Sequence, residues 1–170
     1  MLPLVALAFA LALRAPAAPE ARASCPPHLF VLERSTNANV VVYDAKRLPS
    51  GELDPARPVV AYWIVNADRG QREELTSFQW NRAYGFGCRP SQKAGRYRMT
   101  FKASRGRSLA IQILDGCPVA MTRIAGRRGV VRRIVVHVGK KLLVLPTVDS
   151  VEIFGEDPET REPLHEEFHP

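Results

Sequence analysis

Alternation of apolar and polar residues dominates the second half of the chain. In residues 97–104, Tyr97, Met99, Phe101 and Ala103 are expected to face a core, and Arg98, Thr100, Lys102 and Ser104 to face solvent. Apolar stretches follow at 108–116, 118–126 and 130–139, separated by turns that contain glycine. Strands spaced about ten residues apart are typical of an antiparallel meander.

Further strands are predicted on both sides of this meander. Residues 28–35, 39–47 and 59–70 read as strands, and the last of these is apolar on both faces, which predicts a central position. Residues 140–145 and 148–155 add one or two more. About eight strands predict a mainly β fold, a small antiparallel barrel or sandwich, because closure removes exposed strand edges.

The period changes at residues 72–87, where we predict a single helix after the third strand. The apolar positions near helical spacing are Leu75, Phe78 and Ala83. Glu73 and Glu74 would lie in the first turn, where the helix dipole favours acids, and Gly85 would end the helix.

Residues 1–23 are predicted to be a signal peptide. The apolar run 2–13 is shorter than the roughly 20 residues that a membrane span needs, and Ala21-Arg22-Ala23 provides a cleavage pattern. We therefore expect an exported protein of the periplasm or cell surface, with residues 24–170 as one mainly β domain.

Three cysteines, Cys25, Cys88 and Cys117, would survive cleavage. An oxidising compartment favours one disulfide and leaves one thiol over. All three pairings remain open, and we favour Cys88–Cys117 because both residues lie in the same half of the fold. Lipid anchoring at Cys25 is the less favoured alternative, because Arg22 stands where the lipidation signal usually has Leu.

Charge is segregated along the chain. Residues 82–141 carry 15 Lys and Arg with one acid, Asp115, whereas residues 149–170 carry eight acids and only Arg161. Residues 82–141 could form a basic face for an anionic polymer or a membrane surface. Alternatively, the acidic last strand pairs beside the basic ones, which is the interpretation we favour. Nucleic acid is not expected, because the chain is exported and lacks interleaved aromatic residues.

Residues His165 to His169 spell H-E-x-x-H, the zinc motif of many metalloproteases. Helical spacing would bring the two histidines about 6 Å apart, but on a strand they lie about 13 Å apart. Pro163 and Pro170 flank a segment of barely two turns, and a third ligand would have to come from upstream, for example His137 or Glu152. We expect no metal site here.

Other catalytic signals are weak. The sequence has no G-x-S-x-G, no phosphate-cradling glycine loop and no C-x-x-C, so we expect no cofactor. Glu33 and Asp44 could flank a cleft as paired carboxylates, or they could be turn and edge charges. His28 and His137 lie in predicted strands and are expected to be packed or solvated.

Three stretches, 32–47, 61–87 and 148–168, resemble the bacterial family of domain of unknown function 4833. The matching features are the R-S-x-N-x-N segment at 34–39, Tyr62-Trp63, G-x-R-x-E-L at 70–75 and Ala83-Tyr84-Gly85. The resemblance implies an envelope location and a mainly β fold, and it implies that 165–169 is extended. It implies no activity.

Polar residues within otherwise apolar blocks are the candidate ligand-binding set: Arg34, Asn37, Asn39, Tyr62, Arg72, Glu74 and Tyr84. They could line a cleft between the helix and the first hairpin. They could equally form a buried polar network that locks the helix to the sheet.

The sequence supports three hypotheses of function. The first is a non-enzymatic envelope module that binds a small ligand, glycan or peptide near Arg34, Tyr62 and Tyr84. The second is an envelope hydrolase with Glu33 or Asp44 as acid or base. The third is an electrostatic adaptor that binds anionic envelope polymer or membrane through residues 82–141.

Overall fold

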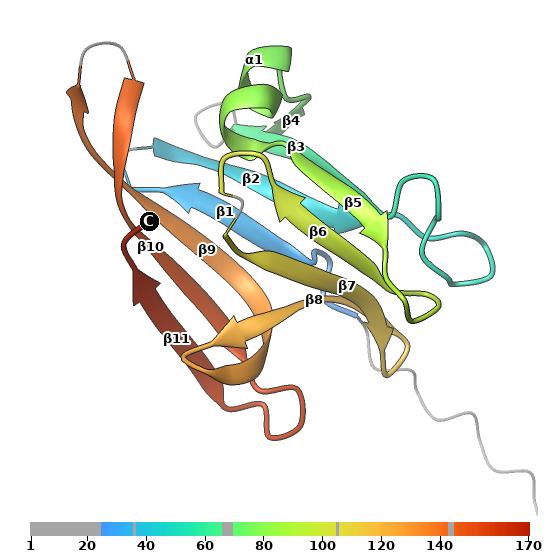
Figure 1. The fold of residues 1–170 in the computed structure, drawn as a ribbon. Helices are drawn as coiled ribbons and strands as arrows, with labels where there is room; N and C mark the ends of the chain where they lie inside the picture. The colour runs from blue at the N-terminus through green and yellow to red at the C-terminus, as the bar shows by residue number, and fades with distance from the viewer. Residues whose placement is uncertain (1–24, 36, 66–69, 105, 143–144) are drawn as a thin grey trace, which may run out of the picture.

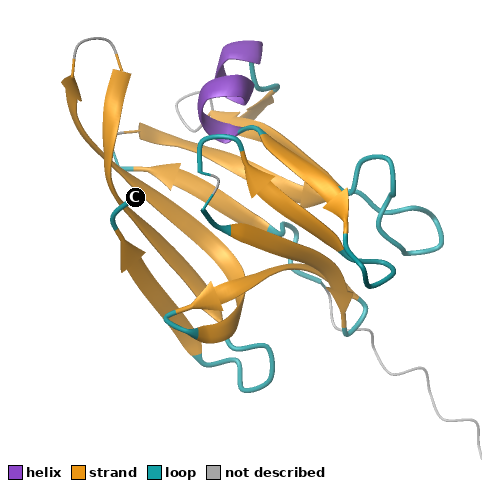
Figure 2. Cartoon of the chain, viewed as in Figure 1, coloured by secondary structure: helices purple, strands orange, loops and turns teal. Residues whose placement is uncertain are grey.

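The structure is a computed structural model that describes residues 25–35, 37–65, 70–104, 106–142 and 145–170 (Figure 1). The elements are β1 (Phe30–Arg34), β2 (Asn37–Ala45), β3 (Val59–Val65), β4 (Gln71–Glu73), α1 (Ser77–Gln79), η2 (Trp80–Tyr84), β5 (Phe86–Pro90), β6 (Tyr97–Phe101), β7 (Ser108–Leu114), β8 (Cys117–Ile124), β9 (Arg127–Leu142), β10 (Leu145–Glu156) and β11 (Pro163–Phe168). The mainly β prediction is confirmed (Figure 2). The predicted signal peptide, residues 1–23, lies outside the described residues.

All described strands belong to one mixed sheet, which the long strand β9 divides into two arms. The order is β4-β3-β2-β1-β9-β8-β7-β6-β5, with β10 on β9 and β11 on β10. Residues 127–130 of β9 pair with β8 and residues 133–136 pair with β1, while β10 pairs along the opposite edge. The β1–β4 arm and the β5–β8 arm therefore leave β9 from the same edge, one after the other.

The two arms lie over each other and enclose an aromatic core (Figure 1). Tyr43 of β2 stacks on Phe30 at 4.5 Å between ring centroids and meets Phe101 of β6 edge-on at 5.7 Å. The inward positions of β6, Tyr97 and Met99, are buried as the alternation predicts, although Ala103 lies beyond the strand and is exposed.

The predicted closed arrangement of about eight strands is not confirmed, because the described residues form eleven strands in a sheet that does not close. The short strands β4 and β5 were not predicted, since neither alternates over enough residues. Strand β3 is also less central than expected, because only the three-residue β4 lies beyond it.

The helix is shorter than predicted and follows β4 rather than the third strand. Thr76 caps it through a capping box with Gln79, so Glu73 and Glu74 precede the first turn instead of occupying it. Gly85 ends it as predicted, since it is the C-cap residue and has an extended backbone. A side chain would not fit there, because a Cβ atom would lie 1.9 Å from the carbonyl oxygen of Trp80. Phe78, one of the apolar positions on which the helix prediction rested, is 65% exposed.

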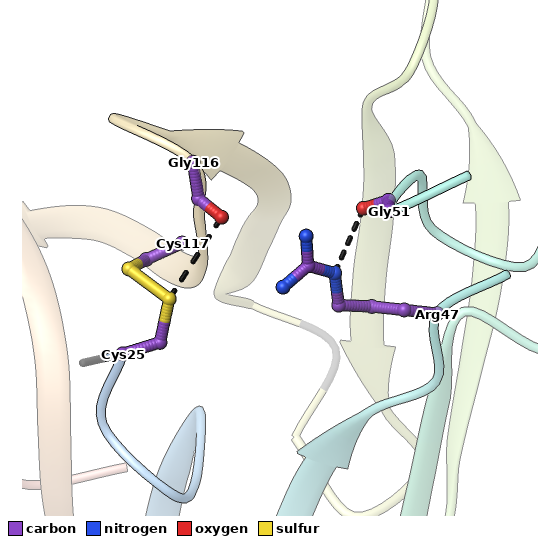
Figure 3. The surroundings of a disulfide bond; sticks show 5 residues. All are labelled: Cys25, Arg47, Gly51, Gly116 and Cys117. Carbon is purple, nitrogen blue, oxygen red and sulfur yellow. Dashed lines mark hydrogen bonds between the residues drawn. A yellow bond between two sulfur atoms is a disulfide. The ribbon is translucent and has the colours of Figure 1, made fainter. Parts of the chain in front are cut away.

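The favoured disulfide pairing, Cys88–Cys117, was wrong, since Cys25 joins Cys117 (Figure 3). Cys88 is free. Two strands separate β5, with Cys88, from β8, with Cys117, which puts them at least about 14 Å apart and beyond disulfide reach. The bond closes a loop of 92 residues, worth roughly 4–5 kcal/mol in the chain-entropy model. A sulfur in a disulfide cannot also carry a lipid, which argues against anchoring at Cys25.

Candidate functional site

Two of the predicted site residues, the half-buried Arg34 and the buried Tyr84, meet where the helix packs on the β1–β4 arm. Arg34 Nη1 donates to Tyr84 Oη at 3.2 Å, and Tyr43 Oη donates to the Tyr84 carbonyl oxygen at 2.9 Å. The Tyr84 ring lies edge-on to Trp63 at 5.0 Å. These contacts fit the predicted polar network between helix and sheet rather than an open cleft.

Tyr62 and Arg72 lie on the opposite, outer face of the same arm. Tyr62 Oη donates to Asp44 Oδ2 at 2.7 Å, and Asp44 Oδ1 lies 2.6 Å from His28 Nδ1. The Arg72 guanidinium covers the Tyr62 ring at 3.6 Å. Burial and the hydrogen bond to Asp44 raise the pKa of Tyr62 to about 12.

The other predicted residues lie on β2 and just before the helix. Asn37 pairs with Arg34 through the backbone, and its side chain lies outside the described set. Asn39 is half-buried in β2, and Glu74 is exposed just before the N-cap. The predicted set is therefore divided between two faces of the β1–β4 arm.

The predicted carboxylate pair does not form. Glu33 pairs with Val40 in the sheet, and Asp44 lies four residues further along β2, about 13 Å away. Glycosidase carboxylates lie within about 10 Å of each other. Each carboxylate is also engaged elsewhere, Glu33 with Arg133 Nε at 3.5 Å and Asp44 with His28 and Tyr62.

The H-E-x-x-H segment is extended, as the resemblance implied, because it forms β11. His165 Nε2 and His137 Nε2 lie 2.7 and 2.5 Å from the two carboxylate oxygens of Glu152. His169 instead contacts the carbonyl oxygen of Asp149. Of the upstream residues named as possible ligands, Glu152 contacts His165 and His137 contacts Glu152. The described part of the chain nevertheless holds no group of three or more such side chains arranged to bind a metal.

Acids of the C-terminal segment neutralise several arginines of the basic segment, as favoured from the sequence. Arg107 Nη2 and Nη1 donate to Glu166 Oε1 and Oε2 at 2.6 and 3.1 Å, which lowers the pKa of Glu166. Arg127 contacts Asp157 and Glu162 at 3.0 and 3.1 Å. Arg132 and Arg161 both contact Glu156 at 2.7 Å. We call this set the C-terminal ion pairs.

Among the described residues, the cations of the helix and the β5–β6 hairpin are not paired with acids. Within the part of the chain that the structure describes, the basic residues here form no ion pair: Arg82, Arg89, Lys93, Arg96, Arg98 and Lys102. Residues 75–114 contain no Asp or Glu. Arg105 and the side chains of Lys140 and Lys141 lie outside the description.

Three of these cations surround a groove of about 670 Å³ on the outer face of the hairpin. We call it the basic groove, and its lining residues are Asn81, Gly87, Arg89, Arg98, Thr100, Phe101 and Lys102. Arg89 and Arg98 are direct cross-strand neighbours, and Lys102 Nζ donates to Asn81 Oδ1 at 2.8 Å. Gly87 leaves the floor open, since a Cβ atom there would meet nothing within 4 Å.

The family model described as domain of unknown function (DUF4833) matches residues 30–167. The chain belongs to the DUF4833 family. No curated protein and no solved structure matches it. The description of DUF4833 assigns no activity, so a functional site in this chain has to be argued from the geometry of its residues.

The matched range of this DUF4833 chain includes every residue of the basic groove but begins after His28 and Cys25. Sequence reasoning did not single out the groove. The signal that could have found it is the alternation in β6, which places Arg98 and Thr100 on the solvent face, combined with the lack of acids around them. Among the described residues no helix is long and apolar enough to cross a membrane.

Proposed function

We propose that this protein is a non-enzymatic binding module of the bacterial cell envelope, and that its ligand carries phosphate or carboxylate groups which occupy the basic groove. The observation that carries the proposal is the cross-strand pair Arg89–Arg98, which lines one hollow with Lys102 and, among the described residues, forms no ion pair with an acid. The proposal combines the ligand-binding and electrostatic hypotheses and assigns both to one surface, the basic groove.

The chemistry of arginine supports this assignment. Like charges directly opposite each other on a sheet repel, so Arg89 and Arg98 raise the free energy of the unliganded surface. An anion between them would remove that repulsion and accept paired N–H donors from a guanidinium fork. Asn81 and Thr100 add neutral polar groups that can donate to the same anion.

Export remains part of the proposal. The Cys25–Cys117 disulfide supports an oxidising compartment, in agreement with the predicted signal peptide.

A titration with inorganic phosphate, followed by NMR of backbone and arginine side-chain N–H groups, tests the groove. We expect shifts centred on Arg89 and Arg98 that disappear in the double variant Arg89→Gln/Arg98→Gln. The matched control is Arg123→Gln/Arg128→Gln, another exposed cross-strand arginine pair without an ion pair but outside the groove. Equal loss of binding in both double variants would reduce the effect to net charge and overturn the site.

A hydrolase is the second candidate, and the structure changes the roles within it. Asp44 bonds through Oδ1 to His28 Nδ1, an arrangement that orients a histidine as general base through Nε2. In this proposal His28 activates a water molecule and Asp44 positions it. Hydrolysis of cell-wall fragments that is abolished by His28→Ala and retained in Arg89→Gln/Arg98→Gln would favour this candidate over the binding module.

A further inference from the structure

Phe78 of α1 stands out among the described side chains, because it is 65% exposed whereas its apolar neighbours Leu75, Trp80 and Ala83 pack against the core. The described chain has only two other exposed large apolar residues, Leu48 and Val148. They lie on other elements, so Phe78 is a single protruding ring rather than part of an apolar patch.

Helical spacing places this ring beside the basic groove. Asn81 and Arg82 follow Phe78 by three and four residues, in the π-helical turn that continues α1, and all three side chains are exposed. Asn81 lines the groove and accepts a hydrogen bond from Lys102. The exposed ring, Arg82 and the groove therefore form one continuous surface at this end of the molecule, where Figure 1 shows the helix beside β5 and β6.

From this surface we infer that the protein docks on an anionic phospholipid bilayer, with Phe78 in the interface and headgroup phosphates in the basic groove. The inference rests on the proposed anion-binding function and names its partner. A lone aromatic ring surrounded by cations matches a bilayer interface, where the ring meets acyl chains while Arg and Lys meet headgroups. The described surface around Phe78 carries no further exposed large apolar side chain, so it lacks the contiguous apolar patch that marks many protein–protein interfaces.

The test is co-sedimentation of the mature protein with vesicles of phosphatidylcholine alone or mixed with phosphatidylglycerol. We expect binding only to the mixed vesicles, and weaker binding as salt rises. Phe78→Ser should lower the affinity about tenfold, since the ring loses its apolar contact. Arg89→Gln/Arg98→Gln should lower it about 30-fold, since two cations near the headgroups are lost.

Two controls separate the site from general effects. Val148→Ser removes an apolar side chain that is 45% exposed on β10, and Arg123→Gln/Arg128→Gln removes the same charge as the groove variant. Both should bind within about twofold of the unmodified protein. Phe78→Trp should also show a blue-shifted emission with mixed vesicles, as a ring entering the interface does.

The outcomes distinguish the two proposals. If inorganic phosphate perturbs the groove but the vesicles do not bind, or Phe78→Ser binds them unchanged, the bilayer inference is wrong and the anion-binding function stands. If neither phosphate nor vesicles bind, both are wrong. If Phe78→Ser instead abolishes a concentration-dependent dimer in sedimentation velocity, the ring is a contact between copies, which also overturns the inference.

Discussion

The arginines of the C-terminal ion pairs and those of the basic groove have different neighbours. Arg107 and Arg132 lie across from acids of β10 and β11 and are paired with them. Arg89 lies across from Arg98, another cation. The sequence segment 82–141 contains both kinds, so its net charge alone does not identify a binding surface. What identifies it is that three cations without an ion pair among the described residues line one groove, whereas Arg123 and Arg128, which also lack one, lie outside it.

The largest expected effect is the loss of stability when the C-terminal ion pairs lose an acid. Glu166→Gln breaks the double hydrogen bond to Arg107 and weakens acceptance from the Ala125 N–H, so we expect a loss of about 2 kcal/mol in the free energy of unfolding. Urea denaturation measures it. The adjacent exposed Glu167 makes no side-chain bond with the described residues, and Glu167→Gln should change little. Equal effects of the two variants would contradict the ion-pair assignment.

Placing an acid in the basic groove should neutralise its cations, as acids neutralise those of the C-terminal ion pairs. Thr100 lies across from Gly87 on the groove floor, so Thr100→Glu brings a carboxylate near Arg98 and Lys102. We expect phosphate affinity to fall at least about tenfold because the new carboxylate occupies the cations. Thr100→Gln, which has the same size without the charge, should keep most of the affinity. Phosphate titration by NMR compares them.

Acid should affect the two regions differently. The pKa of Glu166 is lowered in the folded state by its bond to Arg107, so its stabilisation is present above its ordinary pKa of about 4.5 and is lost as pH falls through the folded pKa. Thermal unfolding between neutral pH and pH 3 should show this loss. Glu166→Gln should flatten that part of the profile, and Arg89→Gln should leave its shape unchanged. A profile unaltered by Glu166→Gln would show that other groups control it.

The smallest expected effect is a gain in stability rather than a loss. Arg89→Gln removes the repulsion with Arg98, so we expect a gain of a few tenths of a kcal/mol in the free energy of unfolding. Arg107→Gln should lose stability instead, because it leaves Glu166 without its partner. If both substitutions destabilise, Arg89 has a structural role that its contacts do not reveal.

The periodicity of neighbouring residues predicted individual strands and the end of the helix. It did not predict which distant strands lie side by side. The alternation in β6 and the helix stop at Gly85 follow from neighbouring residues and were confirmed. The disulfide pairing depended on β1 lying parallel to β9, which places Cys25 near Cys117 and which no local period reveals.

The candidate site shows the same limit. Tyr62 and Tyr84 looked like one cluster, but Tyr62 faces outward from β3 whereas Tyr84 is carried into the core by the helix. Half of the basic groove was visible as the outward face of β6. The other half comes from β5, where Gly87 and Pro90 interrupt the alternation of apolar and polar residues that would indicate a strand.

The disulfide also bears on how fast this sheet can assemble. Pairing β1 with β9 joins residues roughly 100 apart in sequence, the kind of contact that slows folding. Once Cys25 and Cys117 are joined, the same contact closes a path of only roughly 20 residues. Loop-closure entropy then falls by about 1.4 kcal/mol, which corresponds to roughly tenfold in rate. An oxidised chain should therefore form the junction between its two arms soon after collapse, whereas a reduced chain must search for it.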